Sequence, residues 1–220
     1  MCLKNSFLLL AFAFFAMSSF SQDNWTHFRG TNMDGCATVE KAPLHWSDST
    51  NVVWKVPVKG QGWSSPVVFG QQVWLTSASK DGKEFFTFCF DLKTGKLLDE
   101  KTIFTSEDPQ RIHSTNSYAT PTPCIEEGFV YVHFGTFGTA CINTTNFEVV
   151  WKREDMHCDH MQGPASSPIL YKNMLIVHLE GTVDPYVVAL DKHTGETIWK
   201  SVRPKEIYDK LEPVYRKSYQ

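Results

Sequence analysis

Short runs of alternating apolar and polar residues fill most of the chain, and turn residues separate them. Three stretches begin alike: WSSPVVFGQQVWL (63–75), TPTPCIEEGFVYV (120–132) and ASSPILYKNMLIV (165–177). In each one, a proline leads into a short apolar run, a turn and a second, alternating run. Alternation with a period of two is typical of β-strands. The pattern therefore predicts an all-β chain between residues 23 and 203, without an amphipathic helix.

The leading prolines, Pro66, Pro123 and Pro168, are separated by 57 and 45 residues. Repeats of this period indicate propellers or arrays. Each unit continues with a third run, a tight turn and a fourth run, which predicts a four-stranded antiparallel meander. Proline lacks an N–H donor and keeps the preceding residue extended, so it suits the entry into the innermost strand of a blade.

The third and fourth runs share a second pattern, seen in CFDLKTGKLLD (89–99), CINTTNFEVVW (141–151) and ALDKHTGETIW (189–199). A glycine suits a turn position with positive φ, and an aspartate can accept hydrogen bonds from turn amides or a threonine hydroxyl. The tryptophans are expected to be buried against the neighbouring unit. The residues of this blade motif are Asp91, Thr94, Gly95, Trp151, Asp191, Thr194, Gly195 and Trp199.

This pattern resembles the tryptophan-docking repeat of the pyrroloquinoline-quinone-like, or quinoprotein-type, β-propellers, over roughly residues 25–203. The third copy has the whole pattern, whereas the first has Asp99 in place of tryptophan, and the second has Asn143 for aspartate and Asn146-Phe147 for Thr-Gly. The resemblance implies a β-propeller of four-stranded antiparallel blades. Because propellers close with about four to eight blades, we expect an incomplete ring of about three to four blades.

Residues 51–56 (NVVWKV) look like the outer strand of a final blade supplied from the N-terminal side. We expect residues 22–220 to be a partial propeller belonging to a longer protein. Residues 1–21 have the features of a signal peptide: Lys4, an apolar run over 7–17 and small residues at 19 and 21. No other run approaches the about 20 apolar residues of a membrane-spanning helix. We therefore expect a secreted or periplasmic protein without a transmembrane segment.

The formal net charge of −3 and the lack of a basic stripe argue against nucleic-acid binding. Five cysteines follow the predicted signal peptide. In the resemblance, Cys89 and Cys141 take the place of Ala189, a small buried residue, and this interpretation is favoured over a redox or ligand role. Cys124, on an inner strand, is interpreted in the same way.

Long connections are expected on one face of the propeller, formed by the links between blades and the loops between second and third strands. Function gathers on loops held by a rigid scaffold, so we place a ligand or partner site on this long-loop face, near the mouth of the central channel. The hydroxyl residues of the repeat would ring this mouth, although a role in strand entry is favoured for them. The candidate ligand-binding residues are Trp63, Ser65, Arg111, His113, Thr122, His157, His160 and Ser167.

The loop MHCDHMQGP (156–164) contains potential metal ligands, His157, Cys158, Asp159 and His160. It has no second matched pair, so a solvent-facing loop is favoured over a metal site. His133 and His178 occupy the same blade position, about 10 Å apart if their blades pack as sheets do, which is too far for a shared metal. No metal site is expected.

No catalytic motif of a hydrolase, metalloprotease or nucleotide-binding enzyme is present. The leading hypothesis is a non-catalytic binding or scaffold propeller for a protein or carbohydrate partner, with a cell-envelope association also considered. The alternative is an extracytoplasmic quinone-dependent sugar or alcohol dehydrogenase. For that enzyme, the resemblance implies pyrroloquinoline quinone and calcium, but the adjacent cysteine pair that accompanies them in the family is missing, so no cofactor is assigned.

Overall fold

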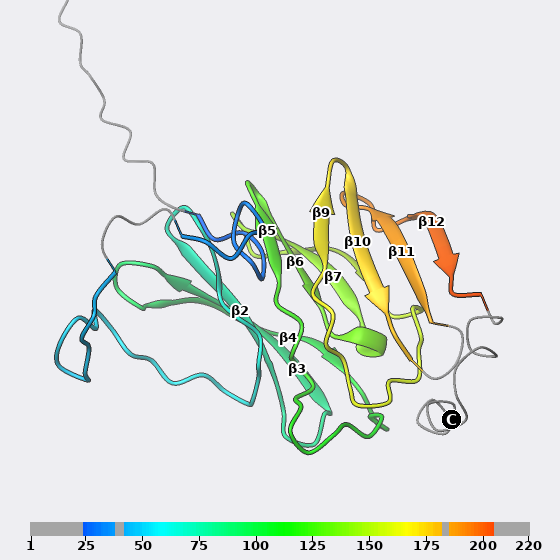
Figure 1. Ribbon diagram of the computed structural model, residues 1–220, viewed down its shortest axis with the longest axis horizontal. Coiled ribbons are helices and arrows are strands. Elements are labelled where there is room, and N and C mark those ends of the chain that lie inside the picture. Colours follow the sequence, from blue (N-terminus) through cyan, green and yellow to red (C-terminus); the bar gives the residue numbers. More distant parts are fainter. Residues whose placement is uncertain (1–23, 38–41, 182–184, 205–220) are drawn as a thin grey trace, which may run out of the picture.

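The computed structural model describes residues 24–37, 42–181 and 185–204. They form three four-stranded antiparallel sheets, the blades (Figure 1). Blade 1 consists of β1 (Val67–Phe69), β2 (Gln72–Ala78), β3 (Glu84–Asp91) and β4 (Leu97–Thr105). Blade 2 consists of β5 (Cys124–Glu126), β6 (Phe129–His133), β7 (Thr139–Asn143) and β8 (Val149–Arg153), with the 3-10 helix η1 (Gly135–Phe137) between β6 and β7. Blade 3 consists of β9 (Ile169–Tyr171), β10 (Met174–Leu179), β11 (Tyr186–Asp191) and β12 (Thr197–Val202).

Strands that are consecutive in the chain are neighbours in each sheet. The predicted fold class, an incomplete propeller of antiparallel four-stranded blades, is confirmed. The innermost strands β1, β5 and β9 each begin at the residue that follows a repeat proline. The predicted signal peptide, residues 1–21, lies outside the described residues. Over the part of the chain that the structure describes, no helix has the length and apolar character that crossing a membrane requires.

Side-chain oxygens close the turns between the third and fourth strands. Asp91 Oδ1 accepts hydrogen bonds from the amide (2.8 Å) and the hydroxyl (2.6 Å) of Thr94. Asp191 Oδ1 accepts from the amides of residues 193 and 194, at 2.9 and 3.0 Å. Asn143 Oδ1 does the same for residues 145 and 146, at 2.8 and 3.2 Å. An amide oxygen therefore substitutes for the carboxylate without changing the turn.

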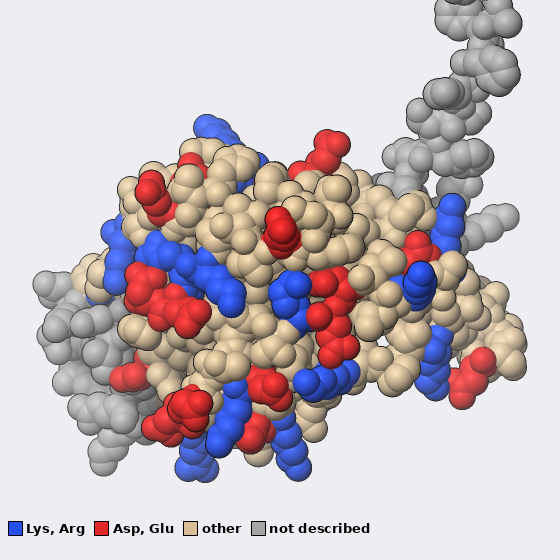
Figure 2. All heavy atoms as spheres, turned by 180° about the vertical axis from the view of Figure 1, so that it is seen from behind, with Lys and Arg blue, Asp and Glu red and all other residues tan. Residues whose placement is uncertain are grey.

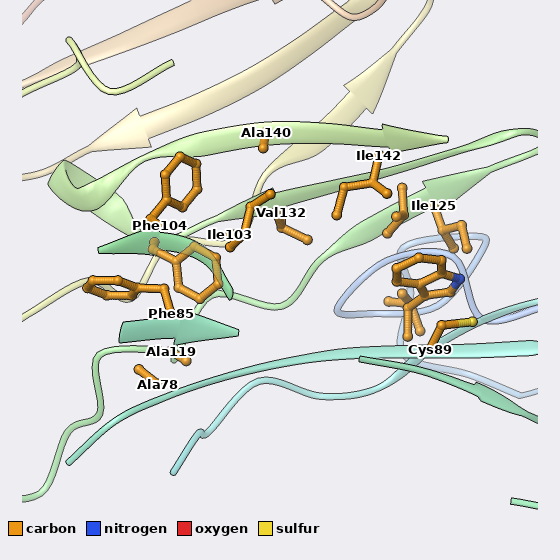
Figure 3. Packing of buried hydrophobic residues seen from close by; sticks show 14 residues of the cluster. Ala78, Phe85, Cys89, Ile103, Phe104, Ala119, Ile125, Val132, Ala140 and Ile142 are labelled. Carbon is orange, nitrogen blue, oxygen red and sulfur yellow. The ribbon is translucent and has the colours of Figure 1, made fainter. Parts of the chain in front are cut away.

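The blades pack face to face, with an apolar core in each gap. Between blades 1 and 2, Phe85 and Ile103 of blade 1 meet Val132 and Ile142 of blade 2 (Figure 3). A second core, between blades 2 and 3, includes Tyr131, the side chain of which is completely buried. Each blade therefore buries apolar side chains against its neighbour, as expected for a repeat architecture.

Two tryptophans dock across blade boundaries in the same way. Trp151 of blade 2 stacks over Gly195 of blade 3, and its Nε1 donates to the carbonyl of Lys192 at 2.9 Å. Trp54 stacks over Gly95 of blade 1, and its Nε1 donates to the carbonyl of residue 92 at 2.8 Å. Each glycine has positive φ, and a Cβ on it would meet the indole at 2.6 to 2.7 Å, so glycine is required for two separate reasons.

The position of Trp54 clarifies the role of residues 51–56. They form no described strand, contrary to the expected outer strand. Trp54 nevertheless occupies the docking position that the last strand of a preceding blade would provide. Trp54, Val56 and Val58 cover the outer apolar core of blade 1, alternating with exposed Lys55 and Pro57.

At the boundary between blades 1 and 2, other residues replace the docked tryptophan and its glycine. Asp99 replaces the tryptophan on β4, and Phe147, with φ of 61°, replaces the glycine. The Phe147 ring instead packs 5.9 Å from the ring of Trp74, which lies on β2 in the cross-strand row Trp74, Cys89, Asp99. The bulky aromatic group of this boundary has thus moved from the outer strand to a middle strand, and a side chain has replaced the bare glycine.

Trp199 differs from the expectation of burial. It is 39% exposed, compared with 9% for Trp151. The face of blade 3 that carries Trp199, together with Ile169 and Tyr171, is not covered by another described blade. The docking residue is in place, and the surface that would receive it is not among the described residues.

The segment 24–35, which precedes the blades, crosses their innermost strands. Trp25 exchanges two backbone hydrogen bonds with Val68 of β1, at 2.9 and 2.8 Å. The carbonyl of Thr26 accepts from the amide of Ile125 in β5 at 3.0 Å, and Nε2 of His27 accepts from the amide of residue 170 in β9 at 3.5 Å. Three consecutive residues therefore contact three consecutive blades at equivalent positions, each two residues after the repeat proline.

Candidate functional site

The long connections lie together at one end of the blades, as predicted. They include the links 106–123 and 154–168 and the loops 79–83 and 134–138 between second and third strands, whereas the hairpin turns lie at the other end (Figure 1). Hydrogen bonds fix the two links to each other. Gln110 bridges the second link by donating to the carbonyl of Cys158 and accepting from the amide of His160, both at 3.1 Å. Asn116 Nδ2 donates to the carbonyl of Gln162 at 2.7 Å. These loops form an ordered surface.

A hollow of about 610 Å³ lies between the two links, lined by residues 110–114 and 159–161. We call it the loop-face hollow. Arg111 and His113 are exposed at its edge, and Met161 is 45% exposed. Arg111 makes no hydrogen bond or ion pair with another described residue, and Nδ1 of His113 contacts only the hydroxyl and amide of Thr115. A guanidinium group, an imidazole and a thioether are therefore exposed together at this hollow.

His160, which lines the same hollow, has both ring nitrogens occupied. Nε2 accepts from the amide of Thr136 at 2.9 Å, so Nδ1 carries the proton and donates to the carbonyl of Glu180 at 3.2 Å. Burial lowers the pKa of His160, with the Glu180 carbonyl opposing this shift. Cys158 Sγ lies 3.4 Å from the ring, and burial raises the pKa of its thiol to about 12. The hydrogen bonds of His160 hold the loop in place, and a thiol with a raised pKa, such as that of Cys158, is a weak nucleophile at neutral pH.

The remaining candidate ligands in this region are separated. His157 is exposed and lines neither of the hollows described here. His133 is buried, with Nδ1 2.8 Å from the hydroxyl of Thr139, and burial lowers its pKa to about 3. His178 instead pairs with Glu180 at 2.9 Å. Within residues 24–37, 42–181 and 185–204, no group of three or more histidine, cysteine or acidic side chains is arranged to hold a metal ion.

The hydroxyl residues of the repeat connect adjacent blades. The amide of Ser65 donates to Oγ1 of Thr122 at 2.9 Å, and the amide of Thr122 donates to Oγ of Ser167 at 3.0 Å. Thr122 is buried, whereas Ser65 and Ser167 are half-buried. The hydroxyls of Thr122 and Ser167 each accept the backbone N–H at the equivalent position of the preceding blade, which gives these two residues a role in joining the innermost strands.

A second hollow, of about 590 Å³, lies beside the innermost strands, and we call it the axial hollow. The residues three before each proline, Trp63, Thr120 and Ala165, all line it. Trp63 is 63% exposed, and its equivalents in the next two blades are small, which leaves room beside the indole. The axial hollow is completed by His27, Phe28, Arg29 and Met33 of the N-terminal segment and by Ser166, Ser167, Pro168, Ile169 and His178 of blade 3.

Five of the eight candidate residues line the two hollows, and Ser65, Thr122 and His157 line neither. Arg111, His113 and His160 share the loop-face hollow, whereas Trp63 and Ser167 share the axial hollow. Sequence reasoning missed the contribution of the N-terminal segment, because residues 24–35 belong to no repeat. The glycines of this segment are the sequence feature that could have indicated its turns, because Gly30 and Gly35 both have φ of 78° and Gly30 packs against the Trp25 ring.

Lysine and arginine side chains are interspersed with acidic ones over the face opposite to that of Figure 1 (Figure 2). Among the described residues, some oppositely charged side chains form local pairs, such as Lys192 with Glu126 at 2.7 Å and Arg153 with Asp155 at 2.6 Å. This face has mixed charge, in contrast to the basic stripe of a typical nucleic-acid-binding protein.

Four-stranded antiparallel meanders that pack face to face, with their first strands innermost, define a β-propeller. The docking of the Trp151 indole on Gly195 matches the tryptophan-docking repeat of the pyrroloquinoline-quinone-like propellers. A family model described as outer membrane protein assembly factor BamB matches residues 87–201, just over half of the chain. The chain belongs to this family of pyrroloquinoline-quinone-like repeat propellers.

One solved structure supports the fold, and two others show a weaker likeness. Quinohemoprotein alcohol dehydrogenase ADHIIG from Pseudomonas putida HK5 is 15% identical with a TM-score of 0.50, over 75% of this chain and 26% of that one. The quinohemoprotein alcohol dehydrogenase from Comamonas testosteroni is 16% identical (TM-score 0.49, 72% and 26%), and BamB from Moraxella catarrhalis is 14% identical (TM-score 0.45, 69% and 43%). The chain spans about a quarter of the length of these two dehydrogenases. No curated protein matches the sequence.

The described residues do not fit pyrroloquinoline quinone with calcium. Calcium takes six to eight oxygen ligands, usually with several carboxylates, and no aspartate or glutamate lines the axial hollow. The five described cysteines are all unpaired, and Cys89, Cys124 and Cys141 lie in the cores between blades. No chemical step through a quinone is derived for this chain.

Proposed function

We propose that this chain is part of a binding propeller that holds a partner protein on its long-loop face. The observation that carries the proposal is the hydrogen bonding of the two links by Gln110 and Asn116, which fixes the loops before any partner arrives. A preorganised surface loses less conformational entropy on binding. The exposed groups at the loop-face hollow, Arg111, His113 and Met161, are of kinds common in protein interfaces.

We further propose that the protein acts after export, in association with the cell envelope. The signal-peptide pattern of residues 1–21 supports export. The description of the matching family model, an outer membrane protein assembly factor, supports an envelope partner. A binding role also agrees with the electrostatics of Cys158 and His160, whose ionisable groups are occupied in maintaining loop structure.

Site-specific photo-crosslinking in the full-length protein, expressed in its native host, tests the position of the partner. A benzophenone side chain at Ile112 or Met161 should give a discrete cross-linked protein band. The same group at Lys93, in a hairpin turn at the opposite end, should give none.

Substitutions provide the matched control. Arg111→Ala with His113→Ala should reduce the cross-linked band at least tenfold, whereas Lys93→Ala with His193→Ala, an exposed cation and an exposed imidazole at the opposite end, should leave it unchanged. Equal cross-linking from both ends, or an unchanged band after substitution at the loop-face hollow, would contradict the proposal.

A further inference from the structure

The axial hollow has a composition that the proposed function does not use. Phe28 and Trp63 are 56% and 63% exposed, and Met33 is 41% exposed. Large apolar side chains that gather in a concave place usually mark a binding site. Its volume of about 590 Å³ lies within the usual range of small-molecule sites, about 300 to 1,000 Å³.

Hydrogen bonds fix the main chain of Trp63 beside the hollow. The amides of Trp63 and Ser64 both donate to the carbonyl of Ala119, at 3.0 and 3.1 Å. The indole therefore stands at the edge of the hollow while its main chain is fixed to the link before blade 2. Because the main chain is already fixed, only the two side-chain torsions of the indole lose freedom when a flat ligand stacks on it.

The charge of the hollow is positive. Arg29 reaches it from the N-terminal segment, and the one hydrogen bond of its guanidinium group is long, 3.4 Å to the carbonyl of Asp34. Arg29 forms no ion pair with a described residue, and no carboxylate lines the hollow. A guanidinium group binds a carboxylate through two parallel hydrogen bonds, so it favours an anionic ligand.

The wall from blade 3 offers hydroxyl recognition. His178 Nε2 lies 2.9 Å from a carboxylate oxygen of Glu180, to which it donates, and this leaves Nδ1 to accept from the hydroxyl of Ser166 at 3.3 Å. The lone pairs of Ser166 can then accept from a ligand hydroxyl. An apolar platform beside hydroxyl-binding groups suits a sugar ring, which has a C–H face and a rim of hydroxyl groups.

We infer that the axial hollow binds an acidic saccharide. One sugar ring stacks on Trp63, its carboxylate pairs with Arg29, and its hydroxyl groups bond to the wall that carries Ser166 and His178. This site is separate from the loop-face hollow, so a protein partner and a saccharide occupy different parts of the propeller. Arg29 belongs to the segment that crosses all three innermost strands, which makes that segment part of the binding site.

Calorimetric titration of the full-length protein with β-1,4-linked tetraglucuronate tests the inference, with cellotetraose as the neutral saccharide of equal length. Tetraglucuronate should bind at least tenfold more tightly than cellotetraose. Arg29→Gln should abolish this preference, and Trp63→Ala should weaken the binding of both saccharides at least tenfold. Trp46→Ala and Lys80→Gln, which change an exposed tryptophan and an exposed cation outside the hollow, should behave like the wild type.

Other results would overturn the inference. They are the absence of heat with millimolar tetraglucuronate, equal affinities for the two saccharides, and unchanged binding by either hollow variant while circular dichroism shows the native fold. Tighter binding of an aromatic carboxylate, 2-naphthoate, or of an acidic peptide, tetraglutamate, would assign the hollow to another ligand class. The photo-crosslinking of the loop face is independent of each result.

Discussion

Substitution of Gly195 by alanine would place a Cβ 2.7 Å from the Trp151 indole, at a position with φ of +75°. The left-handed conformation alone costs an L-residue about 1–2 kcal/mol. The indole has little room to retreat, because it is 9% exposed and its Nε1 is bonded to the carbonyl of Lys192. Overpacking of this kind adds about 1–3 kcal/mol. We therefore expect Gly195→Ala to lower the free energy of unfolding by about 2–5 kcal/mol, the sum of these two effects.

Gly128 supplies the matched control. It has φ of +84°, and nothing lies within 4 Å of the position of its Cβ. Gly128→Ala should therefore show only the conformational cost of about 1–2 kcal/mol. Trp151→Ala should cost about 3–5 kcal/mol, as expected for a buried indole. In the Trp151→Ala background, Gly195→Ala should lower the free energy of unfolding by no more than Gly128→Ala does, because the indole that the Cβ would meet is absent.

Urea denaturation followed by far-ultraviolet circular dichroism measures these effects without depending on tryptophan fluorescence. Trp199→Ala, at 39% exposure, should shift the midpoint less than Trp151→Ala. The reasoning would be refuted if Gly195→Ala and Gly128→Ala had equal costs, or if the cost of Gly195→Ala were the same with and without the indole.

Three other predictions concern the turns, a buried histidine and the thiols. Asp91→Ala should lower the urea midpoint while Asp91→Asn retains most of it, because the Thr94 hydrogen bonds that lower the pKa of Asp91 need only an acceptor oxygen, as Asn143 shows; equal losses would contradict this. Burial lowers the pKa of His133 to about 3 from an unfolded value near 6.5, so the folded protein loses stability as the pH falls below about 6.5. This residue should account for a loss of about 2 kcal/mol at pH 5. His133→Asn should reduce the loss, which urea titrations at pH 7 and pH 5 measure. Of the five described cysteines, only exposed Cys36 should react rapidly with a maleimide in the native protein, as mass spectrometry of labelled peptides would show. Burial raises the pKa of the Cys89 and Cys141 thiols to about 12. Rapid labelling of either one would contradict the assignment of these residues to the cores.

The repeat pattern was sufficient to predict the blades because the relevant signals are local. A proline at the entry to an inner strand, a period of two and an Asp-Thr-Gly turn each act within a few residues, so the sequence indicates them directly. Gly95 and Gly195 were recognised as turn residues for this reason. The second reason for glycine, the indole above it, follows only from the packing of one blade on another.

The packing at the boundary between blades 1 and 2 could not be predicted from these local signals. Asp99 and Phe147 were recognised as departures from the pattern, but their compensation depends on Trp74, which lies in another strand. The cross-strand register that aligns Trp74 with Cys89 and Asp99 is a property of the folded sheet. The division of the candidate site residues into two hollows also depends on tertiary placement, since Arg111 and His160 meet only after their links bond to each other.

In a repeat protein whose units contact only their neighbours, stability spreads along the array one interface at a time. Residues 25–27 interrupt that scheme, because they bond to all three blades and lie as many as 143 positions from their partner in sequence. During synthesis, these residues emerge before the three described blades and can complete their contacts only after blade 3 has been made. The segment therefore joins blade 1 to blade 3 directly, in addition to the interfaces between neighbouring blades, and its contacts must break before the three blades can separate.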